Sequence, residues 1–180
     1  MNMNNRNISF LSSRSLLLTA AVSGLALGGT LWVKPAFAGT ETSNLSVSAT
    51  VANSCAITTS PASFNSYNPN YDGTAMGTIQ ANCSTGSSAT ITLGQGANAA
   101  SVSTDASPSR RLSNGSGGFL NYNLYQDSTA TLIWGNTNGT GVVINDTGTG
   151  VTKSVYGKIP LGQNVPAGSY TDTVVATITF

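Results

Sequence analysis

Apolar and polar side chains alternate with a period of two along several segments of the chain. The last segment shows the pattern clearly, because every second residue of 174–180 is apolar and threonines occupy most positions between them. Alternation in a run rich in Val, Ile, Thr and Phe predicts a half-buried β-strand. The apolar face of this predicted strand carries Val174, Ala176, Ile178 and Phe180. No residue follows Phe180 in the sequence, so we expect this face to need a cover from elsewhere.

The segment NLSVSATVANSC, residues 44–55, alternates in the same way near the other end of the chain. Its apolar face carries Leu45, Val47, Ala49 and Val51. Between these two ends, short strands are predicted at residues 55–60, 76–84, 88–96, 119–127, 130–136, 141–147 and 152–160. In the segment 119–127, the predicted inner face carries Leu120, Tyr122 and Leu124.

Turn-forming residues separate the predicted strands. Gly, Asn, Ser and Asp recur between them, and no long run shows the 3.6-residue period of an amphipathic helix. Short strands with frequent turn signals predict an all-β sandwich or barrel. Residues 95–118 contain few large apolar side chains, so this segment is predicted to be a long surface loop with at most a short strand.

The first 38 residues have the organisation of a secretory signal peptide. A polar start with Arg6 and Arg14 precedes an apolar run, which ends at the small-residue site Ala36-Phe37-Ala38. We therefore expect cleavage after Ala38 and export from the cytoplasm. The alternative is a retained membrane anchor, because the apolar run approaches the length that spans a bilayer.

Charged side chains are sparse in the remaining chain, residues 39–180. They comprise four basic and six acidic residues, a net charge of −2, and the sequence contains no histidine. Without a basic patch, nucleic-acid binding is not expected. Without histidine, the chain lacks the Ser-His or Cys-His pairs of common nucleophilic enzymes and the usual metal triads. We therefore expect no enzyme activity, no cofactor and no metal.

The other charged and aromatic residues have ordinary structural interpretations. A role in turns is predicted for Asp72, Asp105, Asp127 and Asp146. A solvated surface position is predicted for Arg110, Arg111, Lys153 and Lys158. Packing within the fold is favoured for the aromatic residues, and a sugar-stacking surface is the alternative, for Tyr67, Tyr71, Tyr122, Tyr125 and Trp134.

The two cysteines of the chain are Cys55 and Cys83. An exported protein meets an oxidising compartment, so a disulfide is the favoured interpretation and two buried free thiols the alternative. Closing the loop between Cys55 and Cys83 stabilises a fold by about 3.6 kcal/mol on the chain-entropy estimate.

Several motifs together resemble the spore coat protein U domain family, which includes the archaic, Csu-type chaperone–usher pilus subunits. The motifs are NLSVSATVANSCAI, IQANCS, YNLYQD, YGKIP and VPAGSYTDTVVATITF, and they extend over essentially all of residues 39–180. The most specific are YNLYQD and the Gly-x-Tyr-x-Asp-Thr ending formed by Gly168, Tyr170, Asp172 and Thr173.

The resemblance implies an incomplete immunoglobulin-like sandwich that lacks its final strand. A periplasmic chaperone would lend a strand during export, and an outer-membrane usher would exchange that strand for the N-terminal strand of the next subunit. The partners implied are copies of the same chain, the chaperone, the usher and a tip adhesin subunit. The donor residues would be Leu45, Val47, Ala49 and Val51, and the strand bordering the acceptor groove would contribute Tyr170, Val174, Ala176, Ile178 and Phe180.

This interpretation divides the chain into a signal peptide (1–38), a donor segment (39–53) and a sandwich domain (54–180). The function implied is a structural pilus subunit at the cell surface that polymerises by strand exchange and supports attachment and biofilm formation. The alternative is a non-polymerising secreted or coat protein, or a carbohydrate-binding module, whose N-terminal strand closes its own groove. The donor segment lies very close to Cys55, so the boundary between donor and domain is left open by several residues.

Overall fold

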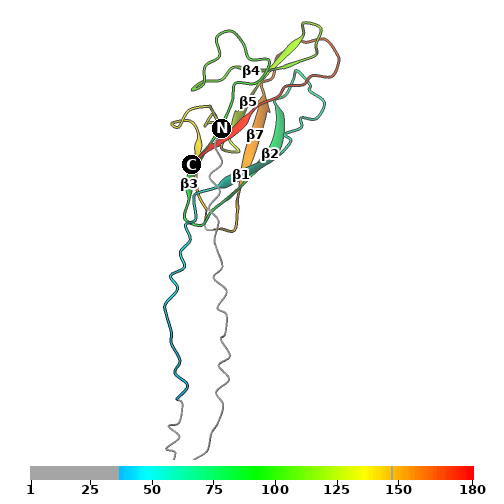
Figure 1. Ribbon diagram of the computed structural model, residues 1–180. Helices are drawn as coiled ribbons and strands as arrows, with labels where there is room; N and C mark the ends of the chain where they lie inside the picture. The colour runs from blue at the N-terminus through cyan, green and yellow to red at the C-terminus, as the bar shows by residue number, and fades with distance from the viewer. Residues whose placement is uncertain (1–36, 147) are drawn as a thin grey trace, which may run out of the picture. The chain divides into compact units, whose positions relative to one another are not determined.

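The computed structural model describes residues 37–146 and 148–180 (Figure 1). Most of the predicted signal peptide, residues 1–36, lies outside the described residues. Two compact units are distinguished, Met1–Val47 and Ser48–Phe180. The described part of the first unit, residues 37–47, is exposed and has no regular secondary structure. No membrane-spanning helix is found among the described residues of the chain.

The second unit contains eight strands among its described residues and no helix. The strands are β1 (Cys55–Ser60), β2 (Gly73–Cys83), β3 (Ser88–Leu93), β4 (Arg110–Ser113), β5 (Phe119–Tyr125), β6 (Val142–Asn145), β7 (Val151–Ile159) and β8 (Ala176–Thr179). They form a five-stranded sheet in the order β1-β2-β7-β5-β4 and a three-stranded sheet in the order β6-β3-β8. All pairings are antiparallel, so the all-β prediction is confirmed as a two-sheet, incomplete immunoglobulin-like sandwich.

The core lies between the two sheets and is built from every second residue of the longer strands. On β5, the predicted inner face of Leu120, Tyr122 and Leu124 is buried, while the residues between them are more exposed. The other large core side chains are Ile79 of β2, Ile91 and Leu93 of β3, Trp134, Ile144 of β6, and Val155 and Ile159 of β7. Burial of these apolar side chains is the main favourable contribution to the stability of the sandwich.

The predicted disulfide between Cys55 and Cys83 is present. The two residues are direct partners in the β1–β2 ladder, with a Cα–Cα distance of 4.0 Å. The bond therefore joins the first residue of β1 to the last residue of β2, at the point where the N-terminal segment leaves the sandwich.

Two predicted strands are absent. Residues 130–136 form only an isolated bridge between Ile133 and Tyr125, because the buried Trp134 turns into the core and donates its indole N–H to the carbonyl oxygen of Ile91 (2.9 Å). Residues 44–54 also form no strand; they are exposed and pair with no strand of the described chain. An alternating sequence becomes a strand only when a second backbone satisfies its hydrogen bonds.

The predicted surface position of Arg110 is wrong. Residues 95–118 do form a loop with one short strand, β4, but the side chain of Arg110 is only 1% exposed. Its guanidinium donates to the carbonyl oxygens of Leu93, Gly94 and Trp134 and to Oδ1 of Asn123. Burial lowers the pKa of Arg110 to about 10, so the group stays charged at neutral pH.

The other basic side chains lie at or near the surface. The Nζ of Lys158 is 2.8 Å from Oδ2 of Asp72, and both side chains are more than a third exposed. Arg111 donates to the carbonyl oxygens of Asn98 and Ala99, and its guanidinium carbon lies 4.0 Å from the centroid of the Phe119 ring. Arg111, Lys153 and Lys158 are each half-buried, so the predicted solvated positions are only partly observed.

Candidate functional site

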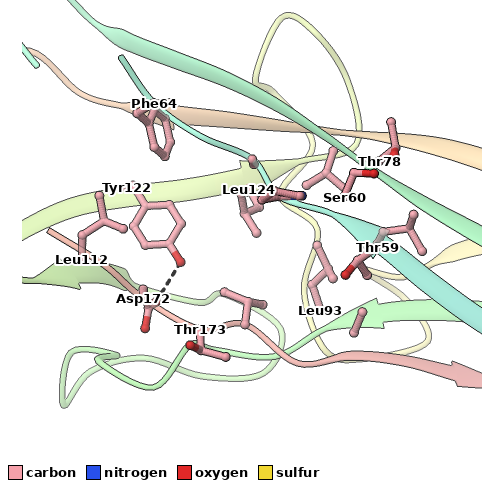
Figure 2. A pocket seen from close by; sticks show the side chains of 16 residues that line it. Thr59, Ser60, Phe64, Thr78, Leu93, Leu112, Tyr122, Leu124, Asp172 and Thr173 are labelled. Carbon is pink, nitrogen blue, oxygen red and sulfur yellow. Dashed lines mark hydrogen bonds between the residues drawn. The ribbon is translucent and has the colours of Figure 1, made fainter. Parts of the chain in front are cut away.

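A groove lies where the core of the sandwich is open to solvent, between β1 with the residues after it and the chain that leads into β8. Its first chamber has a volume of about 290 Å³. One wall is formed by Thr59 and Ser60, and the opposite wall by Val174 and Ala176. The floor is apolar and includes the core side chains of Ile79 and Val155. Figure 2 shows two further apolar lining residues, Leu93 and Leu124.

A second chamber of about 580 Å³ continues the groove. Its lining includes Tyr67, Leu120, Ile159 and Tyr170. The two chambers are contiguous because they share Pro61, Ala62, Phe64, Leu112 and Asp172 in their linings. The groove therefore follows the edges of both sheets and exposes apolar core side chains along its length.

An aromatic pair marks the junction of the two chambers. The rings of Phe64 and Tyr122 meet edge to face, with centroids 6.0 Å apart. Phe64 packs over β7 at Gly157, where an added Cβ would lie 2.7 Å from the ring. The glycine thus makes room for the ring, and the ring forms part of the groove wall.

Asp172 ties the chain that enters β8 to the rest of the sandwich. Figure 2 shows the hydroxyl of Tyr122 donating to Oδ2 of Asp172, at 2.8 Å. The backbone and side-chain amides of Asn98 both donate to Oδ1 of the same carboxylate (3.1 Å each). Burial, and then the hydrogen bond to Asp172, raise the pKa of the Tyr122 hydroxyl well above its usual range. Asp172 therefore positions one wall of the groove.

The tyrosine of the Gly-x-Tyr-x-Asp-Thr ending supports the same wall. The hydroxyl of Tyr170 donates to the carbonyl oxygen of Pro166 (2.7 Å), and its side chain lines the second chamber. In this motif, Tyr170 and Asp172 have structural contacts that account for their presence without any catalytic chemistry.

The structure brings together only some of the residues predicted for the acceptor wall. Tyr170, Val174 and Ala176 line the groove, whereas Ile178 is half-buried against the core and Phe180 is 55% exposed. β8 begins at Ala176 and pairs with β3 alone, which leaves its other edge without a strand partner in the described chain. That unpaired edge faces the groove.

The predicted donor residues are strongly exposed. Leu45, Val47 and Val51 are 88%, 85% and 87% exposed, and Ala49 is also exposed. An alternating row of aliphatic side chains in water is unfavourable, because each loses the free energy of burial.

Sequence reasoning missed the wall that follows β1. Residues 61–67 contribute to both chambers, yet they show no alternation and contain only two large side chains, Phe64 and Tyr67. Two features of the sequence could have indicated this wall: the aromatic Phe64 in a Ser/Asn-rich stretch, and Gly157 within an otherwise regular strand pattern.

The carboxylates have turn and loop partners. Asp127 accepts from the backbone N–H groups of Thr131 and Leu132, and its hydrogen bonds, first that to Thr129, lower its pKa. Asp146, in contrast to an exposed turn residue, is 1% exposed, and the N–H of Cys83 is the main cause of its lowered pKa. Among the described residues, no three His, Cys, Asp or Glu side chains gather as a metal site requires.

The alternative of a sugar-stacking surface loses two of its aromatic residues. Trp134 is fully buried and Tyr122 is 7% exposed, so neither presents a ring face at the surface. Tyr71 is 70% exposed, so of these three aromatic residues it alone presents its ring at the surface.

Comparisons with known proteins agree with this architecture. The model of the Spore Coat Protein U domain matches residues 41–177. Protein U of Myxococcus xanthus is 42% identical over 174 residues, which cover 90% of this chain and 97% of that protein. A solved structure of similar fold is the CsuC–CsuE chaperone–tip adhesion subunit pre-assembly complex from the archaic chaperone–usher Csu pili of Acinetobacter baumannii. The TM-score is 0.53 at 22% identity, over 73% of this chain and 40% of the chain it matches, so this likeness concerns the fold.

Proposed function

The chain belongs to the Spore Coat Protein U domain family, and on that premise we propose that it is a structural subunit of a fibre of the chaperone–usher type. One observation carries the proposal: the sandwich has an open apolar groove beside an unpaired strand edge, and the same chain has an exposed alternating segment. We call residues 39–53 the extension. The extension of one subunit fills the groove of the next.

Addition of a strand to a sheet edge satisfies both partners. The backbone of the extension gains hydrogen bonds from the free edge of β8, and its apolar side chains enter the chambers. Burial of Leu45, Val47 and Val51 contributes about 1.5–3 kcal/mol each, and Ala49 contributes less. Because the contact is head-to-tail and does not close on itself, repetition generates a fibre rather than a dimer.

The partners follow from the open groove. A subunit with exposed core side chains is prone to aggregate, so a periplasmic chaperone covers the groove first. An outer-membrane usher then exchanges the chaperone strand for the extension of the next copy, and a tip adhesin subunit ends the fibre. The similar solved fold is described as a chaperone–subunit complex, which supports the chaperone step alone. The fibre serves surface attachment and biofilm formation outside the cell.

Strand exchange is tested with the full chain and a periplasmic chaperone of this class, co-expressed and analysed on unboiled SDS gels. The full chain is expected to form a ladder of polymers, and a chain without residues 39–52 is expected to give only chaperone-bound monomer. Val47→Asp is expected to abolish the ladder and to leave chaperone binding intact, because it places a charge in an apolar chamber.

Ser46→Asp is the matched control, since it adds the same charge to the other face of the extension. Its ladder should resemble that of the unmodified chain. A stable full-length monomer without a ladder contradicts the proposal and favours a non-polymerising coat protein. Loss of chaperone binding in Val47→Asp shows that this segment is not the donor.

A further inference from the structure

Hydrogen bonds to Ser84 fix the point at which the extension leaves the sandwich. The N–H of Ser84 donates to the carbonyl oxygen of Ser54 (2.8 Å), and the N–H of Ser54 donates to Oγ of Ser84 (3.1 Å). The Ser84 hydroxyl donates in turn to the carbonyl oxygen of Ala52 (3.3 Å). Ser54 precedes Cys55 and Ser84 follows Cys83, so their hydrogen bonds continue the β1–β2 pairing by one residue pair beyond the disulfide.

The length of the connection prevents the extension from filling its own groove in the direction of β1. An extension that runs that way and fills both chambers has its last residues in the second chamber, which Ile159 lines, and Ile159 pairs with Gly73 at one end of β2. Cys83 lies at the other end of this 11-residue strand, about 33 Å away. The four residue steps from Val51 to Cys55 span at most about 14 Å. Residues 51–55 are therefore too short to lead the chain back from the second chamber to Cys55.

The opposite direction makes no such demand on the length of the connection, and there the Ser84 contacts matter. An extension that folds back as a hairpin on β1 has to reverse direction at residues 52–54. A two-residue hairpin turn requires backbone angles that a continuing ladder does not have. Reversal therefore breaks the hydrogen bonds that Ser84 makes with Ala52 and Ser54.

We infer that Ser84 is a positioning residue that holds the extension out of the groove of its own subunit. The extension then enters the groove of a second copy of the chain, and its own subunit's groove receives the extension of another copy. The inference rests on the proposed function and adds to it the reason why exchange occurs between subunits rather than within one.

The first test compares Ser84→Ala with Ser88→Ala, an exposed serine four residues away that makes none of these contacts. Loss of the hydroxyl removes hydrogen bonds equivalent to about a fivefold change in the balance between self-closed monomer and polymer. We expect the ratio of monomer to ladder to rise about fivefold in Ser84→Ala on unboiled gels. Ser88→Ala and Ser84→Thr, which retains a hydroxyl, should match the unmodified chain.

Amide hydrogen exchange of residues 44–52, measured on the monomer fraction, identifies a self-closed subunit directly. These amides should exchange freely in the unmodified monomer and become protected in the Ser84→Ala monomer. An unchanged ratio with unprotected amides in Ser84→Ala overturns the inference. Protected amides in the unmodified monomer overturn it as well, because the extension then already occupies its own groove.

A second variant keeps the inference falsifiable if Ser84→Ala does not fold. About twelve Gly/Ser residues inserted between Asn53 and Ser54 extend the reach beyond the length of β2. The inserted chain should then close its own groove and give protected monomer without a ladder. An unchanged ladder contradicts the reach argument. Absence of any ladder from the unmodified chain, with unprotected amides, contradicts the proposed function and leaves the role of Ser84 standing.

Discussion

Arg110 is a cation in the interior of the sandwich, and backbone carbonyl groups hold it there. Three carbonyl oxygens and the side chain of Asn123 accept its hydrogen bonds, which offsets much of the cost of burial. Its place could not be predicted, because carbonyl groups of distant loops leave no signature in the sequence. An Arg-Arg pair in a Ser/Gly-rich segment has the composition of a solvated loop, but both arginines lie in β4 and the second is half-buried.

Gly96 supplies a residue-scale prediction about the groove wall. Its φ is +91°, and an added Cβ would overlap with Oδ2 of Asp172. Gly96→Ala should therefore displace the carboxylate as well as strain the backbone. We expect a lower midpoint of thermal unfolding and a weaker ladder.

Gly86→Ala is the control for backbone strain alone, because its φ is +82° and no atom lies within 4 Å of the added Cβ. Gly86→Ala should lower the free energy of unfolding by about 1–2 kcal/mol, because alanine is unfavourable in the left-handed conformation. Equal effects of the two substitutions would show that the contact with Asp172 is unimportant.

At the scale of elements, alternation predicted the strands whose two faces differ in burial. β5 is the clearest example, and one wall of the groove could also be anticipated from Val174 and Ala176. The short apolar run at 130–136 failed as a predictor, because apolar residues indicate burial and Trp134 is buried without a ladder. The other wall, residues 61–67, could not be predicted, since its shape depends on the packing of Phe64 over β7.

Gly157 tests how β7 shapes the groove. In Gly157→Ala, the new Cβ would meet the ring of Phe64 at 2.7 Å, so the ring must move, and the groove is the open side. We expect slower polymer formation with little loss of thermal stability, because alanine is no worse than glycine in a strand.

Gly139→Ala is the matched control, as its added Cβ meets nothing within 4 Å. Polymer formation at the unmodified rate in both variants would show that Phe64 does not limit access to the groove. A large fall in the unfolding midpoint of Gly157→Ala would mean that the ring cannot move outward.

At the scale of the whole molecule, the two sheets enclose a core that remains open along one side. The walls of that groove keep their positions only while the sandwich stays folded. The disulfide contributes to the stability of the fold, and it could be predicted from two cysteines and the expected signal peptide alone.

Replacement of both cysteines by serine tests that contribution. The expected loss is about 3–4 kcal/mol of unfolding free energy, measured by thermal unfolding of the folded chain. The unmodified chain in reducing agent should show a similar fall, and the double variant should not respond to the reductant. Equal midpoints for the oxidised chain and the double variant would contradict a stabilising role.

The disulfide also determines how the molecule responds to being pulled. In a fibre, tension on the extension enters the sandwich at Ser54 and reaches Cys55 first. The disulfide transmits this tension from Cys55 directly to Cys83 at the end of β2, a strand that is paired on both sides. Residues 56–82, which include one wall of the groove, lie outside the path of the force. On the proposed function, a pull on the donated strand therefore does not peel β1 away from the strand that the subunit receives.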